Sequence, residues 1–400
     1  MKSCKMNRWL GALALGAMMA AAPAWAEPGV TDNEILIGAL GPLTGATAFV
    51  GGPARDGMQI AVEKINEKGG INGRKLKLIF EQALTPAESV AAAKKLVESD
   101  GVFLLVLASG STGAAAAADY VRQSGIPTYN IAGATPIIRE PFAKNVFHGA
   151  VAEASQSSTV LVSRVADHVK PPRKVGVLVG TYAFPQADLK GVLAQLKGVA
   201  DEVVVEQFDQ GARDYTSQLL SFARKRVNSV IILGDFSEAG FAIKQAPEKG
   251  LTGVTWVLAG TAATDGIIPI LGLENQQNIW SYSSTPFFPG QPAPAMNTFN
   301  ELWRAKYGKP PQGRPNLYDM IGYGSTYVLS EAIEKAGRNL TRDGLISAWT
   351  TLQDAKPSKL GGVDVIYTES FSETNHQGNK IRGQATIRDG MWQVVDEPAK

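Results

Sequence analysis

The chain has 400 residues, of which 44% are hydrophobic and 19% charged, and its formal net charge is +2. Lys2, Lys5 and Arg8 all come before residue 10, and without them 36 Lys and Arg stand against 37 Asp and Glu. A balance this close to zero, with no basic block interleaved with aromatic residues, argues against a nucleic-acid partner. The length exceeds what one hydrophobic core usually serves, so we expect about two domains.

The first 26 residues have the pattern of a secretory signal peptide. Basic residues precede an apolar run over 9–22, and Ala-Trp-Ala at 24–26 is a small-residue cleavage pattern. The run is short for a membrane span, so we expect a soluble protein exported to the periplasm, its mature chain beginning near Glu27. Cys4, the one cysteine, would leave with this segment, which excludes disulfides and thiolate chemistry.

In chain order, the rest of the sequence alternates short apolar runs with helical patterns. A strand is expected over 35–40, a helix over 54–68 and a second strand over 75–80. Thr85 to Glu88 has the form of a capping box with proline at the first helical position. The pattern continues with a helix ending at Gly101, a strand over 102–107, a helix ending at Ser124 and a strand over 126–131.

The same alternation then restarts. Helices are expected over 157–169, 188–199 and 215–226, and strands over 174–179, 202–206 and 229–233. Proline-rich loops over 286–294 and 308–315 precede a helix over 321–335, another after Thr341 and a β-like tail over 363–395. Apolar strands that alternate with helices predict parallel sheets covered on both faces, here in two α/β units.

The turn that follows the expected strand over 102–107 is a candidate anion site. Parallel sheets place ligands at the carboxyl ends of their strands, and a helix N-terminus there offers unpaired N–H groups. Ser109, Ser111 and Thr112 add hydroxyl donors to this turn. The alternative is that these hydroxyls only cap the helix.

A second turn of the same kind follows the next strand, at Asn130 to Pro136. It contains Gly133 and Thr135, and adjacent strands would place the two turns side by side. Two neutral donor loops that converge on one crevice suit a small carboxylate. Thr135 on its own also fits an ordinary turn residue before proline.

Enzyme chemistry finds little support in the sequence. His148, His168 and His376 lie far apart, and Glu81 has no acidic or basic partner nearby in the chain. The G-x-S-x-G elbow, the Walker lysine and the G-x-G-x-x-G fingerprint are missing. We therefore expect no enzyme, no cofactor and no metal.

Four longer stretches resemble one known family. They are "ILIGALGPLTG" at 35–45, "GPARDGMQIAVEKINEKGGINGRKLKL" at 52–78, "TPAESVAAAKKLVESDGV" at 85–102 and "LWRAKYGKPP" at 302–311. They resemble the type I periplasmic binding proteins of branched-chain amino acid importers, the Leu/Ile/Val-binding group. The resemblance extends over nearly all of the mature chain.

The resemblance implies an α/β fold of two doubly wound parallel-sheet lobes joined by a three-strand hinge. It places residues 27–150 and 283–358 in lobe 1, and residues 151–282 and 359–400 in lobe 2. It also implies that a ligand is trapped when the lobes close. Ser109 and Thr135 match the family positions that bind the ligand's carboxylate, while Leu107, Ala108 and Gly133 line the site through their main chain.

The second lobe departs from the family pattern. Family members that bind amino acids usually present two tyrosines and a glutamate there, and the glutamate meets the ligand's ammonium group. The corresponding stretches here supply instead Tyr182 and Phe184, then Asp235 and Phe236, then Gly260 or Thr261.

Two ligand classes are open at this point. Asp235 would supply the missing counter-charge for an amino acid, or the ligand is a carboxylate without an ammonium group, such as an aromatic or short aliphatic acid. Phe49, Phe184 and Phe236 suit an apolar or aromatic ligand body, and each also fits core packing.

The resemblance therefore implies a monomeric solute-binding protein that carries a small carboxylate ligand to ABC permease subunits in the inner membrane. The alternative is a periplasmic sensor of the same fold that reports ligand occupancy to a signalling partner. A hydrolase is disfavoured, because the crevice lacks a recognisable base and nucleophile.

Overall fold

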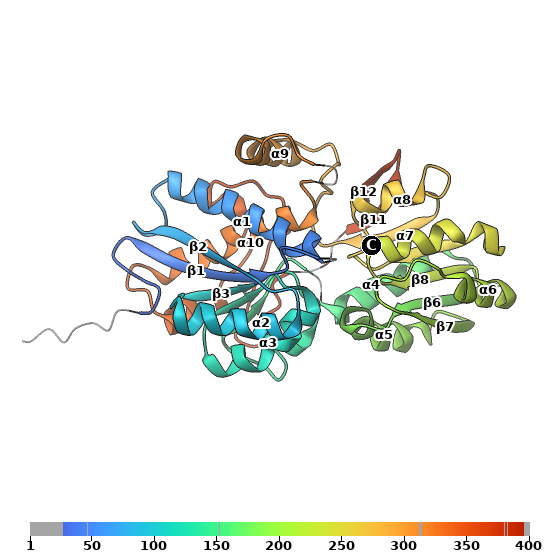
Figure 1. Ribbon diagram of the computed structural model, residues 1–400, viewed down its shortest axis with the longest axis horizontal. Coiled ribbons are helices and arrows are strands. Elements are labelled where there is room, and N and C mark those ends of the chain that lie inside the picture. Colours follow the sequence, from blue (N-terminus) through green and yellow to red (C-terminus); the bar gives the residue numbers. More distant parts are fainter. Residues whose placement is uncertain are drawn as a thin grey trace, which may run out of the picture.

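A computed structural model describes residues 27–45, 47–151, 153–311, 314–379, 381 and 383–395 (Figure 1). The predicted signal peptide over 1–26 lies outside these residues. Two α/β lobes lie side by side, each built on its own sheet. The α/β fold of two parallel-dominated sheets is confirmed.

The sheet of the first lobe has five parallel strands in the order β2-β1-β3-β4-β5. Side chains alternate between its faces along β1, so that Ile35 and Ile37 join one core and Leu40 joins the other. The strands are β1 (Glu34–Gly41), β2 (Lys75–Gln82), β3 (Leu104–Leu107), β4 (Thr128–Asn130) and β5 (Val146–His148).

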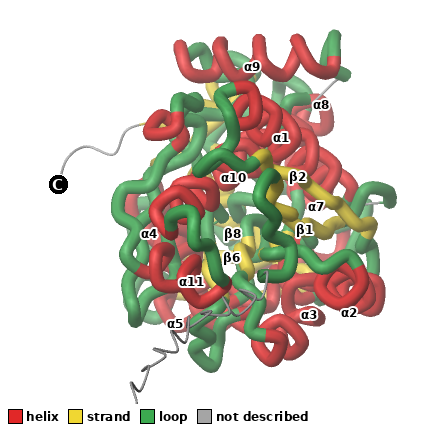
Figure 2. Tube along the Cα trace, turned by 90° about the vertical axis from the view of Figure 1, so that its left-hand side faces the viewer, coloured by secondary structure: helices red, strands yellow, loops and turns green. Residues whose placement is uncertain are grey.

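Helices cover both faces of this sheet, with α1 and α10 on one side and α2 and α3 on the other (Figures 1 and 2). Apolar residues of α9 and α11 extend the core under α1 and α10. The helices are α1 (Ala48–Glu67), α2 (Pro86–Lys94), α3 (Gly110–Ser124), α9 (Pro294–Tyr307), α10 (Leu317–Ala336) and α11 (Arg342–Thr350).

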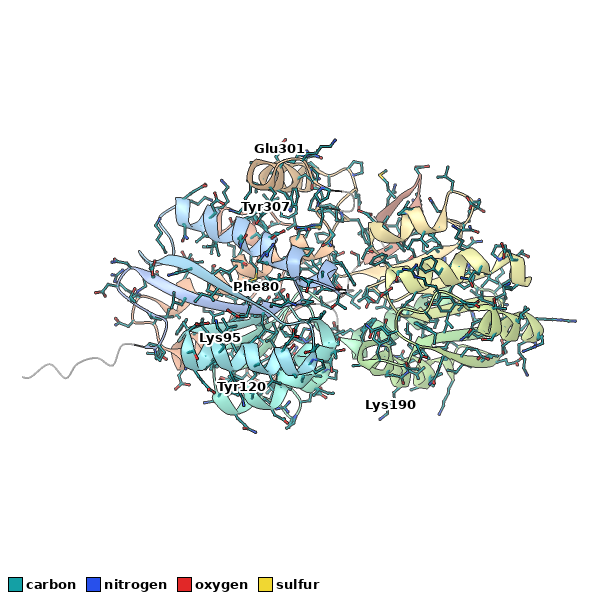
Figure 3. The ribbon with its side chains drawn as sticks, viewed as in Figure 1. Phe80, Lys95, Tyr120, Lys190, Glu301 and Tyr307 are labelled. Carbon is teal, nitrogen blue, oxygen red and sulfur yellow. The ribbon has the colours of Figure 1, made fainter. Side chains whose placement is uncertain are left out.

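Helix α9 lies on the outer side of α1 (Figure 3). Its Trp303 is buried in the core of the first lobe, and the Tyr307 hydroxyl lies 2.9 Å from Gln59 Oε1 on α1. These contacts hold α9 to the first lobe although its sequence neighbours β10 of the second.

The second lobe has seven strands in the order β12-β11-β10-β9-β8-β6-β7. Strands β6 to β10 are parallel, and β11 and β12 add an antiparallel edge. The strands are β6 (Lys174–Gly180), β7 (Glu202–Phe208), β8 (Ser229–Leu233), β9 (Thr255–Leu258), β10 (Ile279–Ser283), β11 (Gly383–Arg388) and β12 (Met391–Val395).

One face of this sheet is covered by α4 and α5 and the other by α6, α7 and α8. The helices are α4 (Ala154–His168), α5 (Ala183–Leu196), α6 (Thr216–Lys225), α7 (Phe236–Gln245) and α8 (Ile268–Leu271). Short helical turns occur at Lys95–Ser99, Pro136–Ile138, Pro247–Lys249, Asp265–Ile267 and Pro357–Leu360.

The predicted capping box before α2 is largely confirmed. Thr85 Oγ1 accepts a hydrogen bond from the Glu88 N–H at 3.2 Å. The Glu88 carboxylate, however, accepts from the Leu84 N–H at 2.8 Å rather than from the cap residue itself. The start of α2 is therefore set by local hydrogen bonds that sequence spacing already indicated.

The chain passes between the lobes three times, after β5, after β10 and before β11. At the first crossing, Glu153 precedes α4 and forms a buried ion pair with Arg139 of the first lobe. Burial alone would raise the pKa of Glu153. Hydrogen bonds and charges from His148 and Arg139 favour its ionised form over the protonated one and lower the pKa to about 2.

The C-terminal boundary between the lobes differs from the predicted one. Residues 359–379 were assigned to lobe 2, but Ile366 and Phe371 are buried in the core of the first lobe. Phe371 packs against Phe147 with ring centroids 5.6 Å apart, and Gln377 forms a bridge with His148 at the end of β5. The predicted β-like tail forms named strands only over 383–395, so periodicity in this segment did not reveal the sheet it would join.

Candidate ligand-binding site

A cavity of about 270 Å³ lies between the two lobes. Its walls come from loops that follow β1, β2, β3 and β4 in the first lobe and β6, β7, β8 and β9 in the second. Both lobes therefore contribute residues from the carboxyl ends of their parallel strands, where open α/β sheets place ligands. Among the described residues that line it, there is no lysine, arginine or histidine.

The N-terminus of α3 forms part of the first-lobe wall. Residues 109–113 all line the cavity, and the first N–H groups of a helix have no partner within the helix. Ser109 Oγ is buried and has no hydrogen-bond partner among the described residues. A Cβ atom on Gly113 would lie 2.6 Å from the Ser109 Cβ, so glycine at 113 leaves room for this side chain. Ser109 therefore lines the cavity with a hydroxyl that has no partner among the described residues.

The turn after β4 lies beside the N-terminus of α3, as the sequence predicts. Ser111 lines the cavity, and its hydroxyl accepts a hydrogen bond from the Ala134 N–H at 2.9 Å. Asn130 stabilises the same turn, because its side-chain oxygen accepts a hydrogen bond from the Gly133 N–H at 3.0 Å. Ala132 and Ala134 line the cavity, whereas Gly133 does not.

Thr135 lies just beyond this wall. Its hydroxyl accepts a hydrogen bond from the Ile137 N–H at 3.3 Å, and the residue is not part of the cavity lining. Thr135 thus stabilises its own turn, which is the alternative that its position before proline suggested.

Two further predicted contacts, Leu107 and Ala108, are fully buried in the sheet rather than in the cavity wall. The Leu107 carbonyl accepts from the Ile131 N–H at 3.1 Å, and the Ala108 N–H donates to the Leu40 carbonyl at 2.9 Å. Bonds to neighbouring segments of the sheet therefore occupy the Leu107 carbonyl and the Ala108 N–H.

In the second lobe, four of the five predicted residues line the cavity: Tyr182, Phe184, Asp235 and Thr261. The fifth, Phe236, packs edge to face against Phe49, which itself lines the cavity from the first lobe. Aromatic side chains from both lobes thus gather at one site, as expected for an apolar ligand body.

Asp235 combines a structural and an electrostatic role. It precedes α7, and its Oδ1 accepts from the N–H groups of Ser237 at 2.8 Å and Glu238 at 3.0 Å. No hydrogen bond reaches its Oδ2 from the part of the chain that the structure describes. The half-buried Asp235 therefore lines the cavity while one carboxylate oxygen bonds to the helix and the other has no hydrogen bond from the described residues.

Two hydroxyl groups of this wall already have partners. The Tyr182 hydroxyl donates to Glu238 Oε2 at 2.6 Å, and the Thr261 hydroxyl donates to the Gly234 carbonyl at 2.8 Å. Burial, followed by the negative charge of Glu238, raises the pKa of Tyr182 well above its ordinary value. Tyr182 therefore stays a neutral phenol at physiological pH.

Sequence reasoning missed Tyr318 and Gln210, which also line the cavity. Tyr318 lies in the first turn of α10, which begins at Leu317, four residues before the predicted start. Tyr318 and Asp235 line the same cavity from different lobes, and burial, followed by the negative charge of Asp235, raises the pKa of Tyr318. No local pattern marks Tyr318, because α10 reaches the site through packing against α1.

A second, smaller cavity of about 20 Å³ adjoins the first and shares Phe184, Thr261 and Tyr318 with it. Gly260 and Tyr282 form part of its wall. A space of this size has room for about one water molecule.

The geometry is that of a two-lobed protein with a cavity of small-molecule size between its lobes. A family model described as periplasmic binding protein matches residues 34–381. The chain belongs to this family, and the resemblance drawn from its sequence stretches is confirmed.

A protein of Brucella melitensis named Leu/Ile/Val-binding protein homolog 7 is 26% identical over 347 residues, which cover 82% of this chain and 83% of the relative. Such relatives are solute-binding proteins and not enzymes, and the chain is of the same kind.

Two solved structures share the fold. One is the branched-chain amino acid transporter substrate binding protein LivJ of Streptococcus pneumoniae in complex with isoleucine, with a TM-score of 0.72, 19% identity and coverage of 91% of this chain and 100% of that one. The other is a solute binding protein of an ABC transporter from Rhodopseudomonas palustris in complex with 3,4-dihydroxybenzoic acid, with a TM-score of 0.75, 19% identity and coverage of 91% and 96%.

No helix among the described residues has the length and apolar character needed to cross a membrane. Within the same residues, no group of three or more His, Cys, Asp or Glu is arranged to hold a metal ion.

Proposed function

We propose that this protein binds a small organic carboxylate between its lobes in the periplasm and delivers it to the permease of an ABC importer. The ligand's carboxylate meets the N-terminus of α3, and its apolar body lies among Phe49, Phe184 and Tyr318. Delivery to a transporter is supported by the two proteins of similar structure, which are the substrate-binding or solute-binding proteins of transporters.

The observation that carries the proposal is the state of Ser109. Ser109 lines the cavity just before a 15-residue helix, and its buried hydroxyl has no hydrogen-bond partner among the described residues. A buried polar group without a partner is costly, so a bound acceptor would stabilise this arrangement. The partial positive charge of the helix N-terminus makes that acceptor an anion, and no basic side chain competes for it in the described lining.

The second-lobe wall bears on the chemical class of the ligand. Asp235 adds a carboxylate to the second-lobe side of the cavity, whereas the anion site lies on the first-lobe side, and this favours a ligand that also carries an ammonium group. An aromatic acid without this group is the competing candidate, and the two neighbours bound to isoleucine and to 3,4-dihydroxybenzoic acid represent the two classes.

A thermal-unfolding screen tests the proposal. The purified protein is heated with amino acids, with their deaminated counterparts and with benzoic acids. A ligand present at a hundred times its dissociation constant stabilises by about 2.7 kcal/mol, which is readily measured. Stabilisation by any of these compounds, with the compound recovered unchanged, supports solute binding. A complete absence of stabilisation across all three classes contradicts it.

A further inference from the structure

Glu238 lies behind the second-lobe wall of the cavity and contacts several of its loops. It is fully buried on the first turn of α7, and it is not itself part of the cavity lining. Its Oε2 accepts from the Tyr182 hydroxyl at 2.6 Å and from the Asp235 N–H at 3.0 Å. Its Oε1 accepts from the Gly211 N–H at 2.8 Å. One carboxylate therefore joins the loops that follow β6, β7 and β8.

A fourth loop is joined through Gly234. The Thr261 hydroxyl, in the loop after β9, donates to the Gly234 carbonyl at 2.8 Å. A Cβ atom on Gly234 would lie 2.7 Å from Glu238 Oε2 and 2.9 Å from Phe208 Cζ, so a larger residue would displace the carboxylate. The hydrogen bonds of Glu238 and of the Gly234 carbonyl together connect every second-lobe loop that lines the cavity.

Helix capping does not account for these contacts. Asp235 and Glu238 form a capping box, which needs only the bond from the Glu238 carboxylate to the Asp235 N–H. The bonds to Tyr182 and Gly211 reach 56 and 27 residues along the chain, and a cap requires neither. A surface acid would cap α7 equally well, whereas this acid is buried and bears hydrogen bonds from three loops.

We propose that Glu238 is a positioning residue that fixes the second-lobe wall in its ligand-binding shape before the ligand arrives. It holds Tyr182 and Asp235 at the cavity and orders the loop that carries Gln210. A wall that is already ordered does not lose conformational entropy when the lobes close on the ligand, so the affinity is higher. This inference rests on the proposed function only for its effect on affinity.

The test compares three variants and one control variant with the wild-type protein. Glu238→Ala removes all three bonds. Glu238→Gln keeps one oxygen for Tyr182 and Asp235 but turns an NH2 group toward the Gly211 N–H. Tyr182→Phe removes only the Tyr182 bond. Glu248→Gln makes the same chemical change at an exposed position of the second lobe and serves as the control.

The first readout is amide hydrogen exchange of the ligand-free protein, and it does not depend on any ligand. We expect several-fold faster exchange at Gly211 and Asp235 in Glu238→Ala, faster exchange at Gly211 only in Glu238→Gln, and wild-type rates in Glu248→Gln. A merely stabilising residue would not give this graded pattern. Wild-type exchange at both amides in Glu238→Ala overturns the proposal, and if that variant does not fold, the glutamine and phenylalanine variants decide.

The second readout is affinity for isoleucine and for 3,4-dihydroxybenzoate, whichever stabilises the wild type. We expect about tenfold weaker binding in Glu238→Ala, a smaller loss in Glu238→Gln and none in Glu248→Gln. Faster amide exchange in Glu238→Ala together with wild-type affinity would overturn the proposal that Glu238 raises affinity by ordering the wall in advance. If neither probe binds the wild type, the import proposal loses support, whereas the exchange pattern still decides whether Glu238 orders the wall.

Discussion

Phe49 of the first lobe and Phe236 of the second meet edge to face across the cleft, with ring centroids 5.3 Å apart and ring planes at 88°. The ring centroids of Phe49 and Tyr318 lie 6.1 Å apart. The Asn316 side chain donates a hydrogen bond to the backbone carbonyl of Phe49 at 3.0 Å. Phe49 is therefore anchored in its own lobe and contributes to the contact between lobes.

The first prediction concerns this aromatic pair. In a double-mutant cycle of Phe49→Ala and Phe236→Ala, we expect a coupling free energy of about 0.5–1.5 kcal/mol in ligand affinity, because the pair forms only when the lobes approach. Isothermal titration of the four proteins measures it. Additive single effects would show that the rings contribute nothing to closure.

The second prediction concerns the anion site. Ser109→Ala should weaken ligand binding by about 1–3 kcal/mol, since it removes a hydroxyl donor to the carboxylate while the fold stays intact. Thr135→Ala should cost less, because the Thr135 hydroxyl bonds within its turn and lies outside the cavity lining. Titration calorimetry of both variants compares the losses, and an equal or larger loss in Thr135→Ala would restore the role that the sequence assigned to this residue.

The third prediction concerns the ligand class. Asp235→Asn keeps the oxygen that accepts hydrogen bonds at the start of α7 and removes the charge at the cavity. We expect the variant to bind amino acids more weakly and to bind their deaminated counterparts equally well or more tightly, because a lone carboxylate repels an anion. The measurement is paired titration with leucine and 4-methylpentanoate. Weaker binding of both compounds would indicate that Asp235 acts through the fold of the loop instead.

The fourth prediction concerns pH. Asp188 on α5 is fully buried, and burial raises its pKa from 3.8 to about 7, although a hydrogen bond from Ser157 opposes the shift. Between these values the folded state keeps a proton that the unfolded state has lost, so the free energy of unfolding falls as pH rises. Ionisation of the buried Asp188 carboxylate therefore lowers the free energy of unfolding by roughly 4 kcal/mol, judged from the size of the pKa shift. This loss is complete above pH 7 and absent below pH 3.8.

Chemical denaturation of wild type and Asp188→Asn at several pH values measures this penalty. We expect the variant to be the more stable protein at pH 8 and its advantage to shrink toward pH 4. Asp389→Asn, at an exposed turn, is the matched control and should follow the wild type. A pH-independent difference between wild type and Asp188→Asn would mean that Asp188 is not protonated in the folded protein near neutral pH.

The sequence predicted some elements closely and missed others for a physical reason. The strand over 229–233 was predicted with the bounds of β8, because five consecutive apolar or small residues end at glycine. Strand β5 has only three residues, which is too short for a periodic pattern, so its sequence does not predict a strand. The segment over 359–379 carries mixed apolar and polar residues, and only its packing against Phe147 reveals which lobe it joins.

For the site, the chemistry available at each strand end could be predicted from local sequence. Ser109 and Ser111 at the N-terminus of α3, and Asp235 before α7, follow from local strand, turn and helix signals, because capping and hydrophobic periodicity act over a few residues. The tertiary structure alone decided which of these groups share a cavity, that Thr135 lies behind its wall, that Tyr318 completes it, and that Glu238 joins loops 27 and 56 residues away. These contacts depend on how distant strands and two separate lobes pack together, and no short stretch of sequence encodes that arrangement.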